Sequence, residues 1–251
     1  MTDFVHLHLH TEYSLLDGLV RLNKIAGKNG DDNIYQNPLK EALKKHGMDA
    51  AAITDHGNMY GVYNFVKSFK GSGIKPIIGC EVYITDDMFD KRPEVLRQRD
   101  HLILLCKNDT GYQNLMKICS AGFVDGFYQK PRVDLNLIEK YSEGLICLSA
   151  CLAGRIPRYL LLNDYDAAKA YAERLKGIFE SGDFYIELQD HNLPEEKHIL
   201  PKLVRLAREI GVKVVATNDV HYINREDADL QDTMMCVQMQ CKKTEHSTAR
   251  F

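Results

Sequence analysis

Short apolar runs recur along the whole chain, and most of them are separated by segments with helical periodicity. The first run, residues 4–10, alternates apolar and polar side chains with a period of two, which is typical of a strand. The further runs span residues 50–54, 77–84, 101–106, 145–149, 184–188 and 212–217. The pattern therefore predicts seven strands spread over the chain.

The segments between the runs predict helices. Asn37 and Pro38 form a typical helix start, a capping side chain followed by a proline in the first turn, and Gly47 can end that helix. The expected helices span residues 38–46, 61–70, 112–123 (with Asp109 or Thr110 as its cap), 167–179, 194–210 and about 226–240. Residues 27–37 are rich in Gly, Asp and Asn and are expected to form a surface insertion or long loop.

Strands that alternate with helices indicate an α/β fold built from βα units. We expect a TIM-barrel-like (β/α) barrel, with an open doubly wound sheet as the alternative. The barrel is favoured because polar residues cluster where strands end, the place at which such barrels carry their chemistry. No linker is evident, so residues 1–251 are expected to form a single domain.

Composition narrows the classes of function. The hydrophobic fraction of 45% and the charged fraction of 27% exclude a disordered or fibrous chain. A net charge of −3 argues against a broad basic face for nucleic acid, so a phosphate-bearing partner must be held locally. We find no transmembrane run and no signal peptide, and the seven cysteines form no CxxC pair. We therefore expect a cytoplasmic protein without a membrane partner.

Histidines and carboxylates at two-residue spacing predict metal binding. His6, His8 and His10 share one face of the first expected strand, where neighbouring imidazoles can converge on one ion. Asp219 and His221 repeat the spacing after the last strand, and both side chains are metal-ligand types. The alternative for the histidines is a polar stripe that faces solvent on an edge strand.

Other candidate ligands are weaker when each is taken alone. Asp17 and the Asp55-His56-Gly57 segment can equally be turn residues. Glu81 lies inside a strongly apolar run, where a carboxylate is costly unless it is paired or bound to a cation. Cys151 follows the fifth strand and can be a small core residue. His101 begins its strand, so either that strand is antiparallel to its neighbour or His101 lies outside the site.

Taken together, these motifs resemble the polymerase-and-histidinol-phosphatase (PHP) domain of bacterial DNA polymerase III alpha subunits. The segments that carry the resemblance are residues 6–18 (HLHLHTEYSLLDG), 53–57 (ITDHG), 78–83 (IGCEVY), 127–132 (FYQKPR) and 217–222 (TNDVHY). The resemblance implies a distorted seven-stranded (β/α) barrel with up to three divalent ions, zinc, manganese or iron, at its C-terminal face. It also implies that the polymerase active site lies beyond this chain, which from about residue 226 leads into a polymerase body.

The resemblance implies a specific ligand set, in which His8 and His10, not His6, form the first pair. The implied groups are His8, His10 and Asp219 for one ion; Glu81, His101 and Cys151 for a second, with Glu81 bridging; and Asp17, His56 and His221 for a third. All these positions carry a ligating residue type. With divalent ions bound, positive charge would exceed that of the anionic ligands by about two, which favours a phosphodiester.

The implied activity is metal-dependent phosphodiester hydrolysis, most specifically 3′–5′ proofreading of a DNA 3′ end. Asp219, Glu81 and His10 are the expected catalytic residues. Lys130 and Arg132 are candidate contacts to the DNA backbone, or else solvated loop charges. Arg155 stands where a glutamate is common in the family, and residues 27–37 look longer than usual, which puts a substrate-facing loop in doubt.

Three alternatives stay open at this point. The first is a catalytically silent module that packs against the polymerase body and can contact a separate proofreading exonuclease. The second is a stand-alone phosphatase for a small phosphomonoester, against which the long polymerase-like motifs and the abrupt end at residues 242–251 argue. The third is an amidohydrolase-type metal barrel, whose carboxylated lysine has no clear counterpart here.

Overall fold

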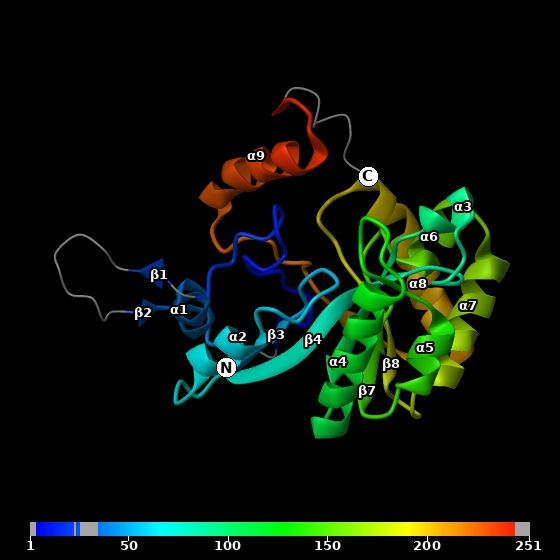
Figure 1. Cartoon of the computed structure of the whole chain (residues 1–251), viewed down its shortest axis with the longest axis horizontal. Coiled ribbons are helices and arrows are strands. Elements are labelled where there is room, and N and C mark those ends of the chain that lie inside the picture. The colour runs from blue at the N-terminus through cyan, green and yellow to red at the C-terminus, as the bar shows by residue number, and fades with distance from the viewer. Residues whose placement is uncertain (1–3, 23, 26–34, 244–251) are drawn as a thin grey trace. The chain divides into compact units, whose positions relative to one another are not determined.

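The computed structural model describes residues 4–22, 24–25 and 35–243, and the chain divides into two compact units (Figure 1). Among the described residues, the first unit comprises residues up to 55, 60–77 and 219–243. The second unit comprises residues 56–59 and 78–218. That residues 1–251 form one domain stays a prediction. Most of the expected insertion at residues 27–37 lies outside the described residues.

The first unit holds short elements from both ends of the chain. Its elements are β1 (Lys24–Ile25), β2 (Tyr35–Gln36), α1 (Pro38–Lys45), β3 (Ala50–Ile53), α2 (Val62–Phe69), the 3₁₀ helix η1 (Arg225–Asp227) and α9 (Ala228–Met239). As expected, Asn37 caps the start of α1, and its side chain accepts a hydrogen bond from the backbone N–H of Lys40. Gly47, at φ +69°, follows its end in the left-handed region that glycine favours.

The first expected strand, residues 4–10, does not form a regular strand. It makes one isolated bridge between His6 and Ala51 of β3 and another between Leu9 and Val220. The backbone carbonyl of His6 accepts from Ala52 N–H at 2.7 Å, whereas His10 N–H donates to Val220 O at 2.7 Å. Each partner thus covers only part of the segment, which prevents a continuous ladder, although His8, Leu9 and His10 are all fully buried.

The second unit carries most of a seven-stranded sheet in the order β3-β4-β5-β7-β8-β9, with β6 beside β4. The strands are β4 (Lys75–Ile84), which starts in the first unit, β5 (Asp100–Cys106), β6 (Arg132–Val133), β7 (Leu145–Leu148), β8 (Phe184–Leu188) and β9 (Lys213–Ala216). The two-residue β6 was not foreseen, because it is too short for a periodic signal. The remaining strands match the apolar runs of the sequence.

Strand β5 departs from the order of an all-parallel barrel. It is antiparallel to both β4 and β7, whereas β7, β8 and β9 are parallel and β6 is parallel to β4. The reversal places His101, the second residue of β5, opposite Tyr83 near the carboxyl end of β4. The expectation that this strand is antiparallel to its neighbour is thus confirmed. The first residues of β5 therefore lie at the same edge of the sheet as the last residues of β4.

Helices of the second unit gather around β7 and β8 (Figure 1). They are α3 (Pro93–Leu96), α4 (Asp109–Val124), α5 (Leu135–Lys140), α6 (Arg155–Leu161), α7 (Tyr165–Ile178) and α8 (Pro194–Ile210). The cap of α4 is Asn108 rather than Asp109 or Thr110, since the Asn108 side chain accepts from Gly111 N–H at 3.0 Å. The apolar faces of these helices pack on the sheet around Leu104, Ile118 and Ile186, so the polar residues that end the strands stay at one edge.

Candidate metal sites

The first cluster of candidate ligands lies in the first unit and joins His8 and His10 to Asp219. The Nε2 atoms of His8 and His10 lie 3.1 and 3.2 Å from Asp219 Oδ1, and 3.1 Å from each other. Both imidazoles are fully buried. The backbone bonds between residues 8–10 and Val220 bring the two chain segments together. Two nitrogens and one carboxylate oxygen thus converge, the donor set that zinc and similar divalent ions take.

Electrostatics keep the Asp219 carboxylate ionised. Burial by itself would raise the pKa of Asp219, but His8, His221 and His10 outweigh burial and hold that pKa well below its usual value. Asp219 also adopts φ +43°, which is uncommon for a residue other than glycine. Such strain is typical of positions at which function fixes the direction of a side chain.

Behind His10 lies the buried carboxylate of Asp55, which the sequence offered either as part of a candidate ligand segment or as a turn residue. Asp55 accepts hydrogen bonds from the Thr11 backbone N–H at 2.6 Å and from the hydroxyls of Thr11 and Ser14, each at 2.7 Å. Ser14 Oγ in turn lies 3.1 Å from His10 Nδ1, so this chain fixes the imidazole and directs Nε2 toward Asp219. The only signal for this role was the position of Asp55 directly after a buried strand.

His221 and Asp17 lie together at the edge of the first cluster. His221 Nε2 is 3.5 Å from Asp17 Oδ1, and the His221 ring stacks on His10 with centroids 4.3 Å apart. The Gln231 side chain of α9 donates to the same Asp17 oxygen at 3.2 Å. The structure therefore brings together Asp17 and His221, two of the three residues expected to hold a third ion. It also adds Gln231, which no motif indicated.

The second cluster lies in the second unit and is centred on Glu81. His56 Nδ1 is 2.5 Å from Glu81 Oε2, and His101 Nδ1 is 2.9 Å from Glu81 Oε1. Cys151 Sγ lies 3.6 Å from His101 Nδ1. Glu81 is fully buried, which by itself would raise its pKa, but His101 and His56 lower that pKa well below its usual value. The arrangement offers nitrogen, oxygen and sulfur donors around one ionised carboxylate.

Local backbone geometry holds His56 against Glu81. The two residues form an isolated parallel bridge, and Gly57 N–H donates to the backbone carbonyl of Glu81 at 2.7 Å. Gly57 has φ +62°, and a Cβ there would lie 2.7 Å from the Pro131 ring and 3.0 Å from the Tyr83 ring. Only glycine fits this turn, which explains the Asp-His-Gly sequence at the end of the strand.

The clusters can be compared with the groups implied by the resemblance. Each cluster contains one implied set, His8 with His10 and Asp219 in the first unit, and Glu81 with His101 and Cys151 in the second. His56 lies beside Glu81, whereas Asp17 and His221 belong to the other unit. The third group and the bridging role of Glu81 between ions therefore stay predictions. His6 packs edge-on against Phe4 and belongs to neither cluster.

The two candidate DNA contacts lie in different surroundings. Lys130 Nζ lies 5.5 Å from the centre of the Tyr83 ring, which stacks on His56 of the second cluster. Arg132 is fully buried and donates to the backbone carbonyls of Gly126 and Val95. This burial contradicts the expected backbone contact for Arg132, because its guanidinium has no surface left for a phosphate. Motif position alone could not separate a buried arginine from a half-buried lysine two residues away.

Arg155, where the family commonly has glutamate, is held inside the protein. Its Nε donates to Asp100 at 2.6 Å, its Nη1 to Asp86, and its guanidinium lies 5.3 Å from the Tyr171 ring centre. Asp100 and Asp86 raise the pKa of Arg155 despite its burial. The arginine thus ties the start of α6 to the β4–β5 segment, and it does not replace any candidate ligand.

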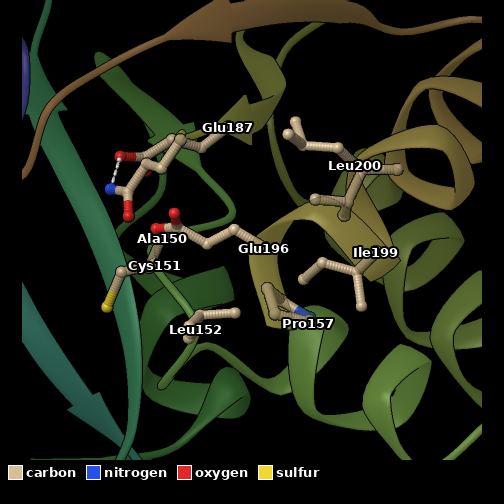
Figure 2. Close-up of a pocket in the computed structure, with 10 residues that line it drawn as sticks. Ala150, Cys151, Leu152, Pro157, Glu187, Glu196, Ile199 and Leu200 are labelled. Atoms are coloured by element: carbon tan, nitrogen blue, oxygen red, sulfur yellow. Dashed lines mark hydrogen bonds between the residues drawn. The ribbon is translucent and has the colours of Figure 1, made fainter. Parts of the chain in front are cut away.

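A small pocket opens beside Cys151 in the second unit (Figure 2). Cys151 directs its sulfur away from the apolar wall that contains Ile199 and Leu200 (Figure 2). On the polar side, Glu187 accepts from Gln189 at 2.9 Å and from the Thr217 hydroxyl. Glu187 and Thr217 therefore join the ends of β8 and β9, a supporting role that no sequence motif indicated.

Comparison with known families agrees with this geometry. The PHP domain family matches residues 6–191. The chain belongs to the PHP domain family. As a PHP domain, it is similar to the DNA polymerase III subunit alpha of Borreliella burgdorferi, at 43% identity over 250 residues that cover 99% of this chain and 20% of the relative. It is also similar to the DNA polymerase III subunit alpha of Thermus aquaticus, at 40% identity over 252 residues that cover 99% of this chain and 20% of the relative. This PHP chain thus spans about a fifth of the length of the curated relatives it matches.

The fold also matches a solved structure. The crystal structure of a protein from Bifidobacterium adolescentis, described as a metal-dependent phosphoesterase, superposes on this chain with a TM-score of 0.50 and 13% identity. The superposition covers 92% of this chain and 95% of the other. At this identity the likeness shows the PHP-type α/β fold alone. Within the described residues, no helix is long and apolar enough to cross a membrane.

Proposed function

We propose that this PHP domain hydrolyses phosphodiesters with bound divalent metal ions, as a 3′–5′ exonuclease within a DNA polymerase III alpha subunit. The observation that carries the proposal is the presence of two donor clusters, each with two imidazoles and an ionised, buried or nearly buried carboxylate. Donors of this kind hold ions that activate water and neutralise phosphate charge. A purely structural barrel would gain nothing from burying such groups, because burial of ionised side chains is costly.

In this proposal the side chains of the chain have distinct tasks. His8, His10 and Asp219 would hold one ion, and Glu81, His101 and Cys151 a second, with His56 beside Glu81. When bound, such ions, zinc, manganese or iron, would supply a water of lowered pKa and positive charge for the phosphate. Asp55 and Ser14 orient His10, which keeps the first donor set in place without rearrangement.

Digestion of 5′-labelled DNA by the purified chain, with Mn²⁺ or Zn²⁺ added, tests the activity. We expect stepwise shortening from the 3′ end that requires the metal. A His8→Ala variant is the control, and it should leave the DNA intact because a ligand at the centre of the first cluster is lost. No shortening by protein that is shown to contain metal would contradict the exonuclease proposal.

Zinc is expected to protect Cys151 from alkylation, which tests its ligand role without an activity assay. Cys151 lies at the edge of the second cluster, whereas burial raises the pKa of Cys106 to about 12. At about pH 8 only roughly one Cys106 thiol in ten thousand is the reactive thiolate, so Cys106 is an internal control. We expect zinc to slow iodoacetamide labelling of Cys151 by about tenfold, measured by peptide mass spectrometry. Equal labelling with and without zinc would remove Cys151 from the ligand set.

The curated relatives favour a second candidate, an interaction module of a larger polymerase. The chain covers about a fifth of proteins named DNA polymerase III subunit alpha. In that case the rest of the alpha subunit, and a separate proofreading exonuclease, would be its partners in the cytoplasm. Full metal content without any nuclease activity in the digestion experiment would favour this candidate over the exonuclease.

A further inference from the structure

The loop of residues 126–131 is held in place by the buried side chain of Arg132. Arg132 is fully buried, and its Nε donates to Gly126 O at 3.1 Å while its Nη1 donates to Val95 O at 3.0 Å. A fully buried arginine is rare and costly unless its donors are used. Here Nε and Nη1 tie both the start of the loop and the β4–β5 segment to one side chain, while Nη2 is buried without a hydrogen-bond partner.

The backbone of the same loop is strained and tightly closed. Gln129 adopts φ +60°, and Tyr128 N–H donates to Lys130 O at 3.1 Å. A Cβ at Gly126 would lie only 1.9 Å from the backbone oxygen of Arg132, so the chain can pass there only as glycine. Strain of this kind persists only where the surroundings fix it, and it is common at binding loops.

Although its base is fixed, the loop presents large apolar side chains to solvent. Phe127 is 52% exposed and Tyr128 is 38% exposed. Phe127 stacks on Phe123 of α4, with centroids 6.1 Å apart and planes inclined by 18°. Rigid, exposed aromatic rings lose little conformational entropy on binding, which makes them suitable stacking surfaces.

The loop adjoins the second cluster through Tyr83. Lys130 Nζ lies 5.5 Å from the centre of the Tyr83 ring. The same ring lies 5.9 Å from His56 and 5.3 Å from His101, measured between centroids. A second cation, Arg99, reaches the loop at Gln129, with its Nη1 3.5 Å from Gln129 Oε1. Aromatic rings and cations therefore lie together next to a candidate metal site.

We propose that this loop binds the single-stranded end of a nucleic acid. Its bases stack on Phe127 and Tyr128, and its phosphates are held by Lys130 and Arg99. The proposal rests on the proposed function and names how the substrate reaches the second cluster. Stacked rings beside cations fit a strand of bases and phosphates, because every base has a flat face and every linkage a negative charge. An apolar protein surface would use the rings but would leave the cations without a role.

Binding of a fluorescein-labelled oligothymidylate to the chain tests the proposal. Phosphorothioate linkages at its 3′ end prevent digestion, so binding is measured by anisotropy in Mn²⁺ buffer without turnover. Phe127→Ala should weaken binding by about tenfold, the loss of one stacked base, with the salt dependence unchanged. Lys130→Ala should reduce the slope of log K against log salt by about 0.7, the value for one phosphate contact on a single strand.

The matched control is Tyr63→Ala on α2. Tyr63 is 72% exposed and has Lys67 Nζ 5.6 Å from its ring centre, so it offers the same chemistry elsewhere on the chain. Its affinity should equal that of the parent chain. Unchanged affinity in Phe127→Ala and Tyr128→Ala would overturn the proposal and leave the loop as a protein-contact surface. Loss of affinity in these variants, in a chain that does not digest an ordinary oligonucleotide, would uphold the loop and contradict only the proposed hydrolysis.

Discussion

Replacing Asp219 with asparagine is expected to abolish hydrolysis while the chain keeps its fold. Asp219 Oδ1 lies 3.1 and 3.2 Å from the Nε2 atoms of His8 and His10 in the first cluster. Asparagine has nearly the same shape but no negative charge, and an amide is a much poorer partner for a divalent ion than a carboxylate. Because a bound ion contributes several kcal/mol of transition-state stabilisation, the rate should fall by at least about a thousandfold.

The rate of release of 3′ nucleotides from DNA measures this loss, beside metal content and thermal unfolding of the same preparation. Asp166→Asn, an exposed aspartate in the first turn of α7, is the matched control and should retain the parent rate. Metal content at the first cluster should fall in the Asp219 variant alone. An Asp219 variant that digests DNA as fast as the parent chain would contradict the proposed mechanism.

The arrangement of the sheet shows what the sequence could and could not predict. Apolar runs located β3, β4, β5, β7, β8 and β9, because each is a mostly apolar run of strand length between more polar segments. The apolar run of β5 does not reveal the direction of the strand. The one indication of an antiparallel strand was that His101, a candidate ligand, begins its run and does not end it. The N-terminal segment alternates like a strand, yet its two partners each cover too little of it for a regular ladder.

The candidate site also has features that the sequence predicts and others that only the fold reveals. Ligand types in ordered motifs were readable, because imidazole and carboxylate at two-residue spacing have a chemical meaning of their own. Supporting residues such as Asp55, Gln231 and Thr217 were not, since their roles arise from contacts between distant segments. Arg132 was misread for the same reason: a charged residue in a motif suggests a ligand contact, and only the fold shows that its guanidinium is buried.

Replacing Arg132 with methionine is expected to lower the free energy of unfolding by about 3 kcal/mol, a large share of the stability of an ordinary domain. Methionine fills much of the space of the arginine stem but leaves the carbonyls of Gly126 and Val95 without their charged donor. The buried carbonyl of Gly126 loses its charged donor, which costs about 1–3 kcal/mol, whereas Val95 O loses one charged bond but keeps the Gln98 N–H at 3.1 Å and the Thr85 hydroxyl at 3.2 Å. Urea unfolding followed by circular dichroism measures the difference.

Two further arginine variants separate hydrogen bonding from charge. Arg132→Lys keeps the charge, but one ammonium group cannot reproduce a planar fork that reaches two carbonyls, so it should recover only part of the lost stability. Arg97→Met removes an exposed arginine from the same β4–β5 segment and should change the unfolding free energy by less than about 0.5 kcal/mol. If Arg132→Met unfolds at the same urea concentration as the parent chain, the guanidinium does not fix the loop. The rigid presentation of Phe127 and Tyr128 would then lose its physical basis, whatever the affinity of the chain for DNA.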